Sequence, residues 1–117
     1  MAHSPYTLRF ATSEDAETIH ALITELAIYE REPTAVVATV EDIRRAGFGE
    51  RRAFEVILAE TESQAVGFAL FFPVFSTWTG KQGLHLEDLF VQRGHRGRGV
   101  GKAIFAALAR LAIDRGW

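Results

Sequence analysis

The sequence predicts an α/β or α+β domain with a mixed sheet, and three patterns in its 117 residues lead to that prediction. Apolar residues recur at helical spacing over residues 16–27. Apolar and β-branched runs at residues 54–59 and 65–75, separated by turn-forming residues, predict a β-hairpin. A third apolar run at residues 84–91 leads through a glycine-rich stretch into an amphipathic helix over residues 99–115.

The N-terminal half supplies a first strand and two helices. Residues 6–10 alternate apolar and polar side chains, which predicts a strand. Thr12 and the acidic residues after it predict a helix start, and this helix is expected to run to about Tyr29, before a proline-containing break. Thr39 is expected to cap a second, short helix that stops at Gly47. The expected order is therefore strand, helix, helix, three strands, helix.

Composition restricts the classes of function. A chain that is 48% hydrophobic and 24% charged is ordinary for a globular protein, and a formal charge of −2 gives no global attraction to nucleic acid or to an anionic membrane. The absence of cysteine excludes disulfides, thiolate catalysis and cysteine-based zinc sites. We expect no metal, because the histidines show no metal-ligand spacing and His3 lies in a short tail. No secretion signal or membrane-length apolar run is seen, so we expect a cytoplasmic protein with neither nucleic-acid nor membrane partners.

The strongest chemical signal lies between the last predicted strand and the last predicted helix. Three glycines at alternate positions leave the backbone open to a ligand, and the following helix points the positive end of its dipole at the same place. Basic residues surround the run and are suited to phosphate oxygens: Arg93, Arg96, Arg98 and Lys102. Residues 92–102 are therefore predicted to bind a phosphate group. The alternative is a glycine-rich turn whose basic residues are merely solvated.

Two common phosphate motifs fit this stretch poorly. The dinucleotide motif needs G-x-G-x-x-G, whereas these glycines are Gly97, Gly99 and Gly101. The nucleoside-triphosphate loop needs Gly-Lys followed by Ser or Thr, and here alanine follows Lys102.

A third pattern, [Q/R]-x-x-G-x-[G/A], is that of the GNAT superfamily of N-acetyltransferases, and residues 96–101 (RGRGVG) resemble it at every fixed position. Other blocks look like those of the diamine, or spermidine/spermine, N-acetyltransferase branch: residues 22–30, 47–50, 66–69, 78–81 and 86–91. The likeness extends from about Leu8 to the end of the chain. It implies a GNAT fold with a mixed, mostly antiparallel sheet and flanking helices, as one partial domain over residues 1–117.

The resemblance implies acetyl-CoA as cosubstrate and direct attack by an acceptor amine, without a covalent enzyme intermediate. Backbone N–H groups of the glycine loop would bind the pyrophosphate, from Arg96, Gly97, Arg98, Gly99, Val100, Gly101 and Lys102. The pantetheine arm would lie beside the last strand and contact the backbone of Leu89, Phe90 and Val91. An N–H of that strand would also polarise the thioester carbonyl.

Two neighbouring acids on the last predicted strand differ in their expected roles. Alternation along a strand places Glu87 and Asp88 on opposite faces, so only one of them is expected to face the thioester. The resemblance implies that Glu87 is the catalytic, substrate-side carboxylate, which takes the amine proton through water or binds a cationic amine. The alternative is that Glu87 only pairs with Lys81 or a nearby arginine. Asp88 is expected to be structural.

Further expectations concern the acceptor side and the aromatic residues. The resemblance implies that Tyr29 and Glu30 bind substrate together with Glu87, and the alternative is a solvated helix end. Trp78 is expected to be a lid, a dimer contact or a core residue. Four phenylalanines are expected to pack in the core: Phe68, Phe71, Phe72 and Phe75.

A complete GNAT domain continues beyond its glycine-loop helix, whereas this chain ends at Trp117. The expectation is therefore a C-terminally truncated domain, with an open edge on its last strand and with weak or no transferase activity but some affinity for CoA. We expect a homodimer that acetylates a primary amine of a small polyamine-like or amino-acid-like acceptor. The alternatives are other acceptors, such as an antibiotic amine or a protein N-terminus, and a non-catalytic CoA-binding or interaction module.

Overall fold

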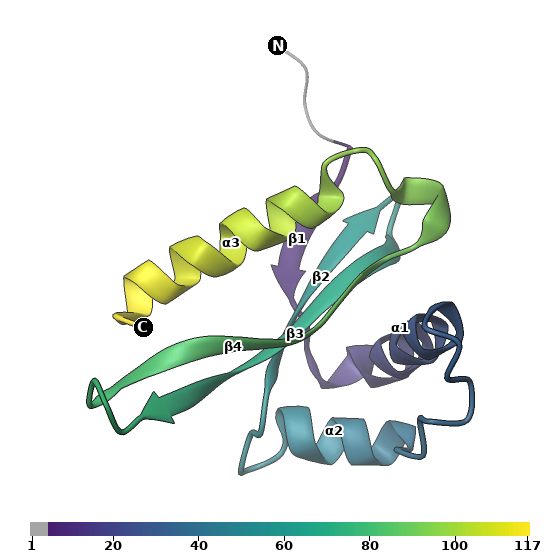
Figure 1. Ribbon diagram of the computed structural model, residues 1–117. Helices are drawn as coiled ribbons and strands as arrows, with labels where there is room; N and C mark the ends of the chain where they lie inside the picture. The colour runs from purple at the N-terminus through teal and green to yellow at the C-terminus, as the bar shows by residue number, and fades with distance from the viewer. Residues whose placement is uncertain (1–4) are drawn as a thin grey trace.

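The computed structural model describes residues 5–117, in which a four-stranded sheet of order β1-β2-β3-β4 separates two layers of helix (Figure 1). The elements are β1 (Thr7–Phe10), η1 (Ser13–Asp15), α1 (Ala16–Tyr29), α2 (Val40–Phe48), β2 (Glu55–Thr61), β3 (Gln64–Ser76), β4 (Lys81–Val91), η2 (Arg93–His95) and α3 (Val100–Arg115). All three strand pairings are antiparallel. The predicted α/β fold and element order are confirmed, but within residues 5–117 the sheet is wholly antiparallel and not mixed as predicted, because each strand pairs with its neighbour in sequence. His3 lies outside the described residues.

Local capping starts the two N-terminal helices where the sequence predicts. Thr12 forms a capping box with Asp15, whose Oδ2 accepts the Thr12 backbone N–H at 2.7 Å, and α1 follows directly. Thr39 caps α2 in the same way, because its side chain accepts the Asp42 N–H at 3.0 Å. The second helix ends at Phe48, one residue beyond the predicted stop.

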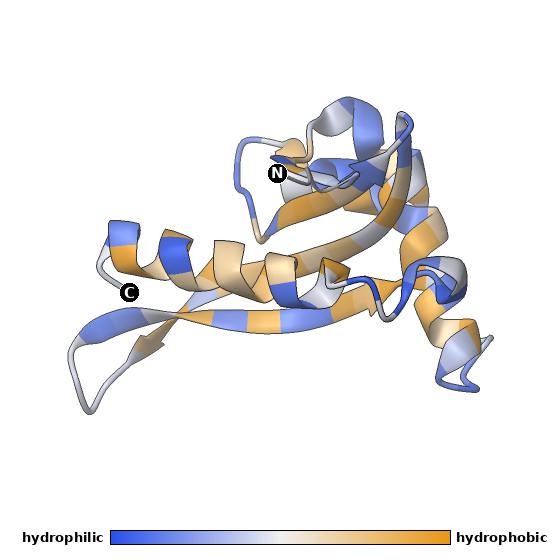
Figure 2. Cartoon of the chain, turned by 90° about the horizontal axis from the view of Figure 1, so that it is seen from above, coloured by the Kyte–Doolittle hydropathy of each residue, from blue (hydrophilic) through white to orange (hydrophobic). Residues whose placement is uncertain are grey.

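Both faces of the sheet are covered, so β3 carries a continuous apolar run rather than a strict alternation. One core cluster lies under α1 and α2, and it includes Ile19, Leu22, Phe68, Leu70 and Phe90. The other lies under α3, and it includes Ile57, Ala69, Phe71, Ile104 and Leu108. Figure 2 shows apolar and hydrophilic colours alternating along the strand beneath α3, and mainly hydrophilic colours over the turn that follows β4.

The hairpin of β3 and β4 is longer than predicted and projects away from the helices (Figure 1). Its strands pair as far as Ser76 and Lys81. Near the tip, Phe75 is 60% exposed and Trp78 is 96% exposed. The expectation that Phe75 packs in the core is therefore wrong, and so is a core position for Trp78, because the hairpin extends beyond the helices that could cover them.

Candidate functional site

The glycine loop joins the end of β4 to the N-terminus of α3, as predicted. Gly97 and Gly99 have positive φ angles of 76° and 81°, and Gly99 is the N-cap of the 16-residue helix. A Cβ atom added at Gly97, Gly99 or Gly101 would meet nothing within 4 Å, so the space beside this backbone is open. The first turn of α3 holds no acidic residue. Unpaired N–H groups and the helix dipole therefore face a space that an anion could enter.

The side chain of Arg96 does not turn toward the glycine backbone. Its Nε donates to the carbonyl oxygen of Val91 at 2.8 Å, and its guanidinium carbon lies 4.3 Å from the centre of the Tyr29 ring. The Phe90 ring centre is 5.5 Å away. From the sequence, the Arg96 guanidinium is expected to bind the phosphate, whereas in the structure it connects the loop to α1 through a cation–π contact with Tyr29. The Arg96 backbone N–H, which was also predicted to bind the pyrophosphate, donates to the carbonyl oxygen of Arg93 at 3.4 Å.

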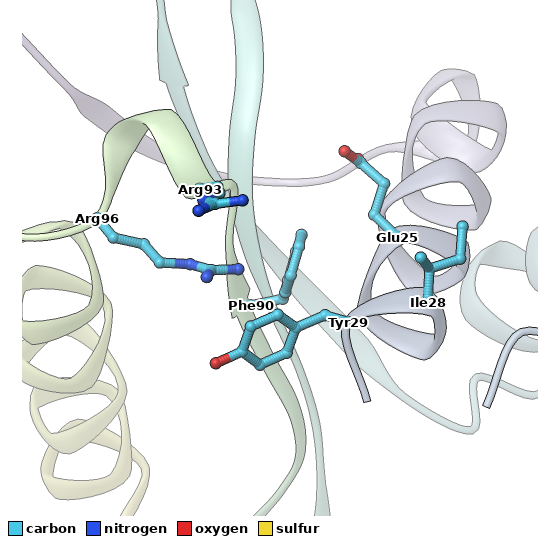
Figure 3. Close-up of a pocket in the computed structure, with 6 residues that line it drawn as sticks. All are labelled: Glu25, Ile28, Tyr29, Phe90, Arg93 and Arg96. Carbon is cyan, nitrogen blue, oxygen red and sulfur yellow. The ribbon is translucent and has the colours of Figure 1, made fainter. Parts of the chain in front are cut away.

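A groove of about 450 Å³ lies between the C-terminal part of α1 and the end of β4 (Figure 3). It is lined by Glu25, Ile28, Tyr29, Phe90, Arg93 and Arg96. Its size is within the range of small-molecule sites. The groove brings Tyr29, predicted on the acceptor side, against Phe90 and Arg96, predicted on the cofactor side. Glu25 is a lining residue that the sequence interpretation missed, because it resembles any other charge on the exposed side of a helix.

A β-bulge in β4 overturns the predicted arrangement of the two acids. Asp88 pairs with Leu70 and Leu86 pairs with Phe71, so Glu87 has no partner in the register. A bulge breaks the alternation of side chains along a strand. Leu70 belongs to the core cluster on the α1 side, which places Asp88 on that face. The expectation of opposite faces is therefore wrong.

The contacts of Glu87 place its side chain on the same α1 side of the sheet. Glu87 Oε1 lies 3.2 Å from His85 Nε2. The His85 ring stacks on Phe72 at a centroid distance of 4.9 Å, and Phe72 packs against the α1-side cluster. Among the described residues the side chain recorded in contact with the Glu87 carboxylate is thus His85, not Lys81 or an arginine.

Asp88 is the electrostatically unusual group of the site. Partial burial raises the pKa of its carboxyl, and the negative charges of Glu87 and Glu30 raise that pKa further. Glu30 follows the last residue of α1, which brings this predicted substrate residue near Asp88. Asp88 therefore lies within electrostatic reach of two other carboxylates, and a cation bound beside Asp88 would relieve this repulsion. The structural role expected for Asp88 therefore leaves out its charge interactions with Glu87 and Glu30.

The other strand residues predicted to contact the cofactor lie on the edge strand of the sheet. Within residues 5–117, no strand pairs with the side of β4 opposite β3. Phe90 is buried at 7% exposure, and Leu89 and Val91 pack against the α3-side cluster. An edge strand offers its backbone N–H and C=O groups to an extended ligand, which is the geometry the sequence interpretation required.

Two structural findings bear on other classes of site. In the described part of the chain, no group of three or more His, Asp or Glu side chains is placed to hold a metal ion. None of the helices described is both long enough and apolar enough to cross a membrane.

Comparisons with known proteins agree on one family. The model of the acetyltransferase (GNAT) family matches residues 14–117. The thialysine N-epsilon-acetyltransferase of Sus scrofa is 37% identical over 117 residues, covering 93% of this chain and 68% of that protein. The human spermidine/spermine N(1)-acetyltransferase-like protein 1 is 35% identical over 92% of this chain and 16% of its own length. A predicted acetyltransferase from Clostridium acetobutylicum, solved with acetyl-CoA, has a TM-score of 0.78 at 16% identity, covering 95% of this chain and 75% of that chain.

Proposed function

The chain belongs to the GNAT acetyltransferase family, and on that premise we propose that it transfers the acetyl group of acetyl-CoA to a primary amine of a small polyamine-like or amino-acid-like acceptor. The observation that carries the choice of acceptor is the group of carboxylates, Glu30, Glu87 and Asp88, on the α1 side of the sheet. The related thialysine and spermidine/spermine enzymes are named for amine acceptors, which supports the same choice.

Acetyl-CoA would bind across the junction of β4 and α3. The N–H groups of residues 97–102 and the N-terminus of α3 suit a pyrophosphate, and Arg98 and Lys102 are the cationic side chains left for it once Arg96 contacts Tyr29. The edge of β4 at Leu89, Phe90 and Val91 suits the amide groups of the pantetheine arm. In this proposal the thioester would lie beside the bulge at Glu87.

The acceptor would approach from the α1 side. Asp88 is held close to like charges, so a bound ammonium group lowers the pKa of the Asp88 carboxyl and is itself bound more tightly. Glu30 lies at the end of α1 next to Tyr29, which is 63% exposed, and the Glu30 carboxylate offers a negative charge to a second ammonium group, whereas the Tyr29 ring already has the Arg96 guanidinium over it. An acceptor with two cationic nitrogens therefore fits better than a neutral or singly charged amine.

The chemical step forms one bond and breaks one. The neutral amine nitrogen attacks the thioester carbonyl, the N–C bond forms, the C–S bond breaks, and CoA leaves as a thiolate that must take up a proton. Because a primary ammonium group has a pKa near ~10, a base must remove its proton first. Glu87 is the proposed acceptor of that proton, through water, since its carboxylate is exposed and lies at the bulge.

The proposal is tested with the purified 117-residue chain, isotopically labelled acetyl-CoA and a panel of amines read by mass spectrometry. The panel contains thialysine, spermidine and putrescine, with butylamine as a monoamine of matched length. Transfer by this chain is expected to be weak, so product is collected over a long incubation, and we expect label on a primary amine of the acceptors with two or more amines and little on butylamine. The matched variants are Glu87→Gln, which should lose product formation, and Glu41→Gln on α2, which should not. CoA binding without transfer to any amine would contradict the catalytic proposal and favour a CoA-binding module.

Two further expectations stay predictions. A cytoplasmic location rests on the cysteine-free sequence, since that composition needs no oxidising compartment. A homodimer rests on the exposed apolar side chains of the hairpin, Val74, Phe75 and Trp78. Sedimentation velocity measures the second directly, and a monomer at all concentrations would contradict it.

A further inference from the structure

The loop between β4 and α3 has little within itself to hold its shape. Gly94, Gly97 and Gly99 all lie between the end of β4 and the start of α3, and two of them have left-handed backbone angles of 76° and 81°. Glycine loses more conformational freedom on ordering than any other residue. The positions of the loop N–H groups therefore depend on side chains that tether the loop from outside.

Two of these tethers connect the loop to the α1 side of the molecule. The Gln92 amide donates to the two carboxylate oxygens of Glu25 on α1, at 3.2 and 3.1 Å. Arg96 donates to the carbonyl oxygen of Val91 at 2.8 Å and stacks on Tyr29. Neither tether reaches the opposite side of the loop, where α3 begins.

The third tether comes from the N-terminal end of the described chain. The Tyr6 hydroxyl lies 3.0 Å from Nδ1 of His95, which is the last residue of the turn η2 before the glycines. The two rings also meet edge to face, with centroids 5.7 Å apart and an interplanar angle of 85°. Tyr6 and His95 are 89 positions apart in sequence, and both are partly buried.

Tyr6 connects the turn η2 to the core of the molecule. Besides contacting His95, it packs against the α3-side core cluster, to which Val100 and Ile104 of α3 also belong. The turn before Gly97 is thereby linked to the same cluster on which α3 packs. Tyr6 also lies N-terminal to the residues, 14–117, that the family model matches.

We infer that the contact between Tyr6 and His95 holds the backbone of the glycine loop in one conformation, and that it thereby sets the affinity of the loop for the diphosphate end of CoA. Both are positioning residues, because they act through the loop backbone and not by contact with the ligand. The inference rests on the proposed function, in which this loop binds the diphosphate. Removing one partly buried hydrogen bond of this kind should weaken binding of CoA by roughly 2- to 10-fold.

The test compares Tyr6→Phe, which removes one oxygen and keeps the ring, with His95→Phe and the double variant. Thr24→Val is the matched control, because it also removes a hydroxyl hydrogen bond, to the His20 carbonyl on α1, away from the loop. Three quantities are measured for each protein: the dissociation constant for CoA by calorimetry, the thermal unfolding midpoint, and the amide hydrogen exchange of residues 97–101. The exchange measurement needs no ligand.

Tyr6→Phe is expected to weaken CoA binding by roughly 2- to 10-fold, to speed loop exchange, and to leave the unfolding midpoint close to that of Thr24→Val. The double variant is expected to lose no more affinity than the more affected single variant, because both changes break the same contact. Unchanged loop exchange in Tyr6→Phe overturns the inference, whether or not CoA binds. Unchanged CoA affinity in that variant, with normal wild-type binding, also overturns it. Failure of the wild type to bind CoA, with faster loop exchange in Tyr6→Phe, contradicts the proposed function instead.

Discussion

Two glycines in the loop should respond to alanine in opposite ways, although the added methyl groups meet the same open space. Gly99 has a φ of 81° and Gly101 has no positive φ, and neither added Cβ would lie within 4 Å of another atom. The difference between the two variants therefore reflects backbone conformation and not steric clash.

The magnitudes follow from that difference. A left-handed backbone costs an alanine about 1–2 kcal/mol, so Gly99→Ala should lower the free energy of unfolding by that order. Gly101 lies in the first turn of α3, where alanine is the better helix former, and Gly101→Ala should raise the free energy of unfolding by about 0.5–1 kcal/mol. At roughly 4 °C per kcal/mol for a domain of this size, the two melting temperatures should differ by about 6–12 °C.

Binding of CoA should separate the variants again. A methyl group at Gly99 stands on the backbone that the proposed function assigns to the pyrophosphate, so we expect affinity to fall at least ~10-fold, or about 1.4 kcal/mol. The GNAT pattern that this loop resembles accepts glycine or alanine at the position of Gly101, so Gly101→Ala should bind CoA within about 3-fold of wild type, a change of less than 1 kcal/mol. Thermal unfolding and calorimetry measure both quantities. A Gly99→Ala protein that is less stable but binds CoA normally would show that the Gly99 backbone does not contact the pyrophosphate.

Four other changes test the account. Asp88→Asn should weaken spermidine binding. Because burial raises the pKa of the Asp88 carboxyl, the same variant should increase the free energy of unfolding at neutral pH but not at a pH below the unfolded pKa. Chemical denaturation across pH measures this difference, and an equal effect at all pH values would contradict it. Glu87→Gln should lower kcat by about 10²- to 10⁴-fold with the KM for acetyl-CoA unchanged in steady-state assays, and a change confined to KM would indicate a binding role only. Phe68→Ala removes a fully buried side chain and should lower the free energy of unfolding by about 3–5 kcal/mol, as measured by urea unfolding. A decrease of less than about 1 kcal/mol would contradict the core position of Phe68. Hydrogen bonds from Arg9 hold the pKa of the Asp15 carboxyl below its ordinary value, so this carboxylate stabilises the fold above its unfolded pKa. That stabilisation is lost as pH falls through the folded pKa of Asp15. Arg9→Gln should therefore reduce the loss of unfolding free energy at acid pH, and an unchanged acid dependence would contradict this expectation.

Elements with local signals could be predicted from the sequence. The capping residues Thr12 and Thr39 mark helix starts through hydrogen bonds to residues three positions ahead, so a short stretch of sequence contains the whole signal. The start of β4 could not be predicted in this way. Lys81 and Gln82 are polar, and they belong to the strand because they pair with Ser76 and Phe75 across the hairpin.

The same distinction holds at the site. The glycine loop could be placed because the strand, the glycines and the helix follow one another in the chain. The bulge at Glu87 could not, since it depends on the register of β4 against Leu70 and Phe71 in the neighbouring strand. The position of the Arg96 side chain likewise depends on Tyr29, which a sequence pattern centred on the loop does not include. Contacts between distant segments therefore decide which predicted residues can act together.

A titration of the isotopically labelled chain with CoA, followed by NMR of its backbone amides, would locate the cofactor site residue by residue. We expect the largest shifts on residues 97–102, at the N-terminus of α3, with a second group at Leu89, Phe90 and Val91 on the edge of β4. Shifts centred elsewhere would contradict it, for example in the groove between β1 and α3 at Leu8, Ala107 and Leu111. The absence of any shift at saturating CoA would contradict the assignment of the glycine loop as the cofactor site.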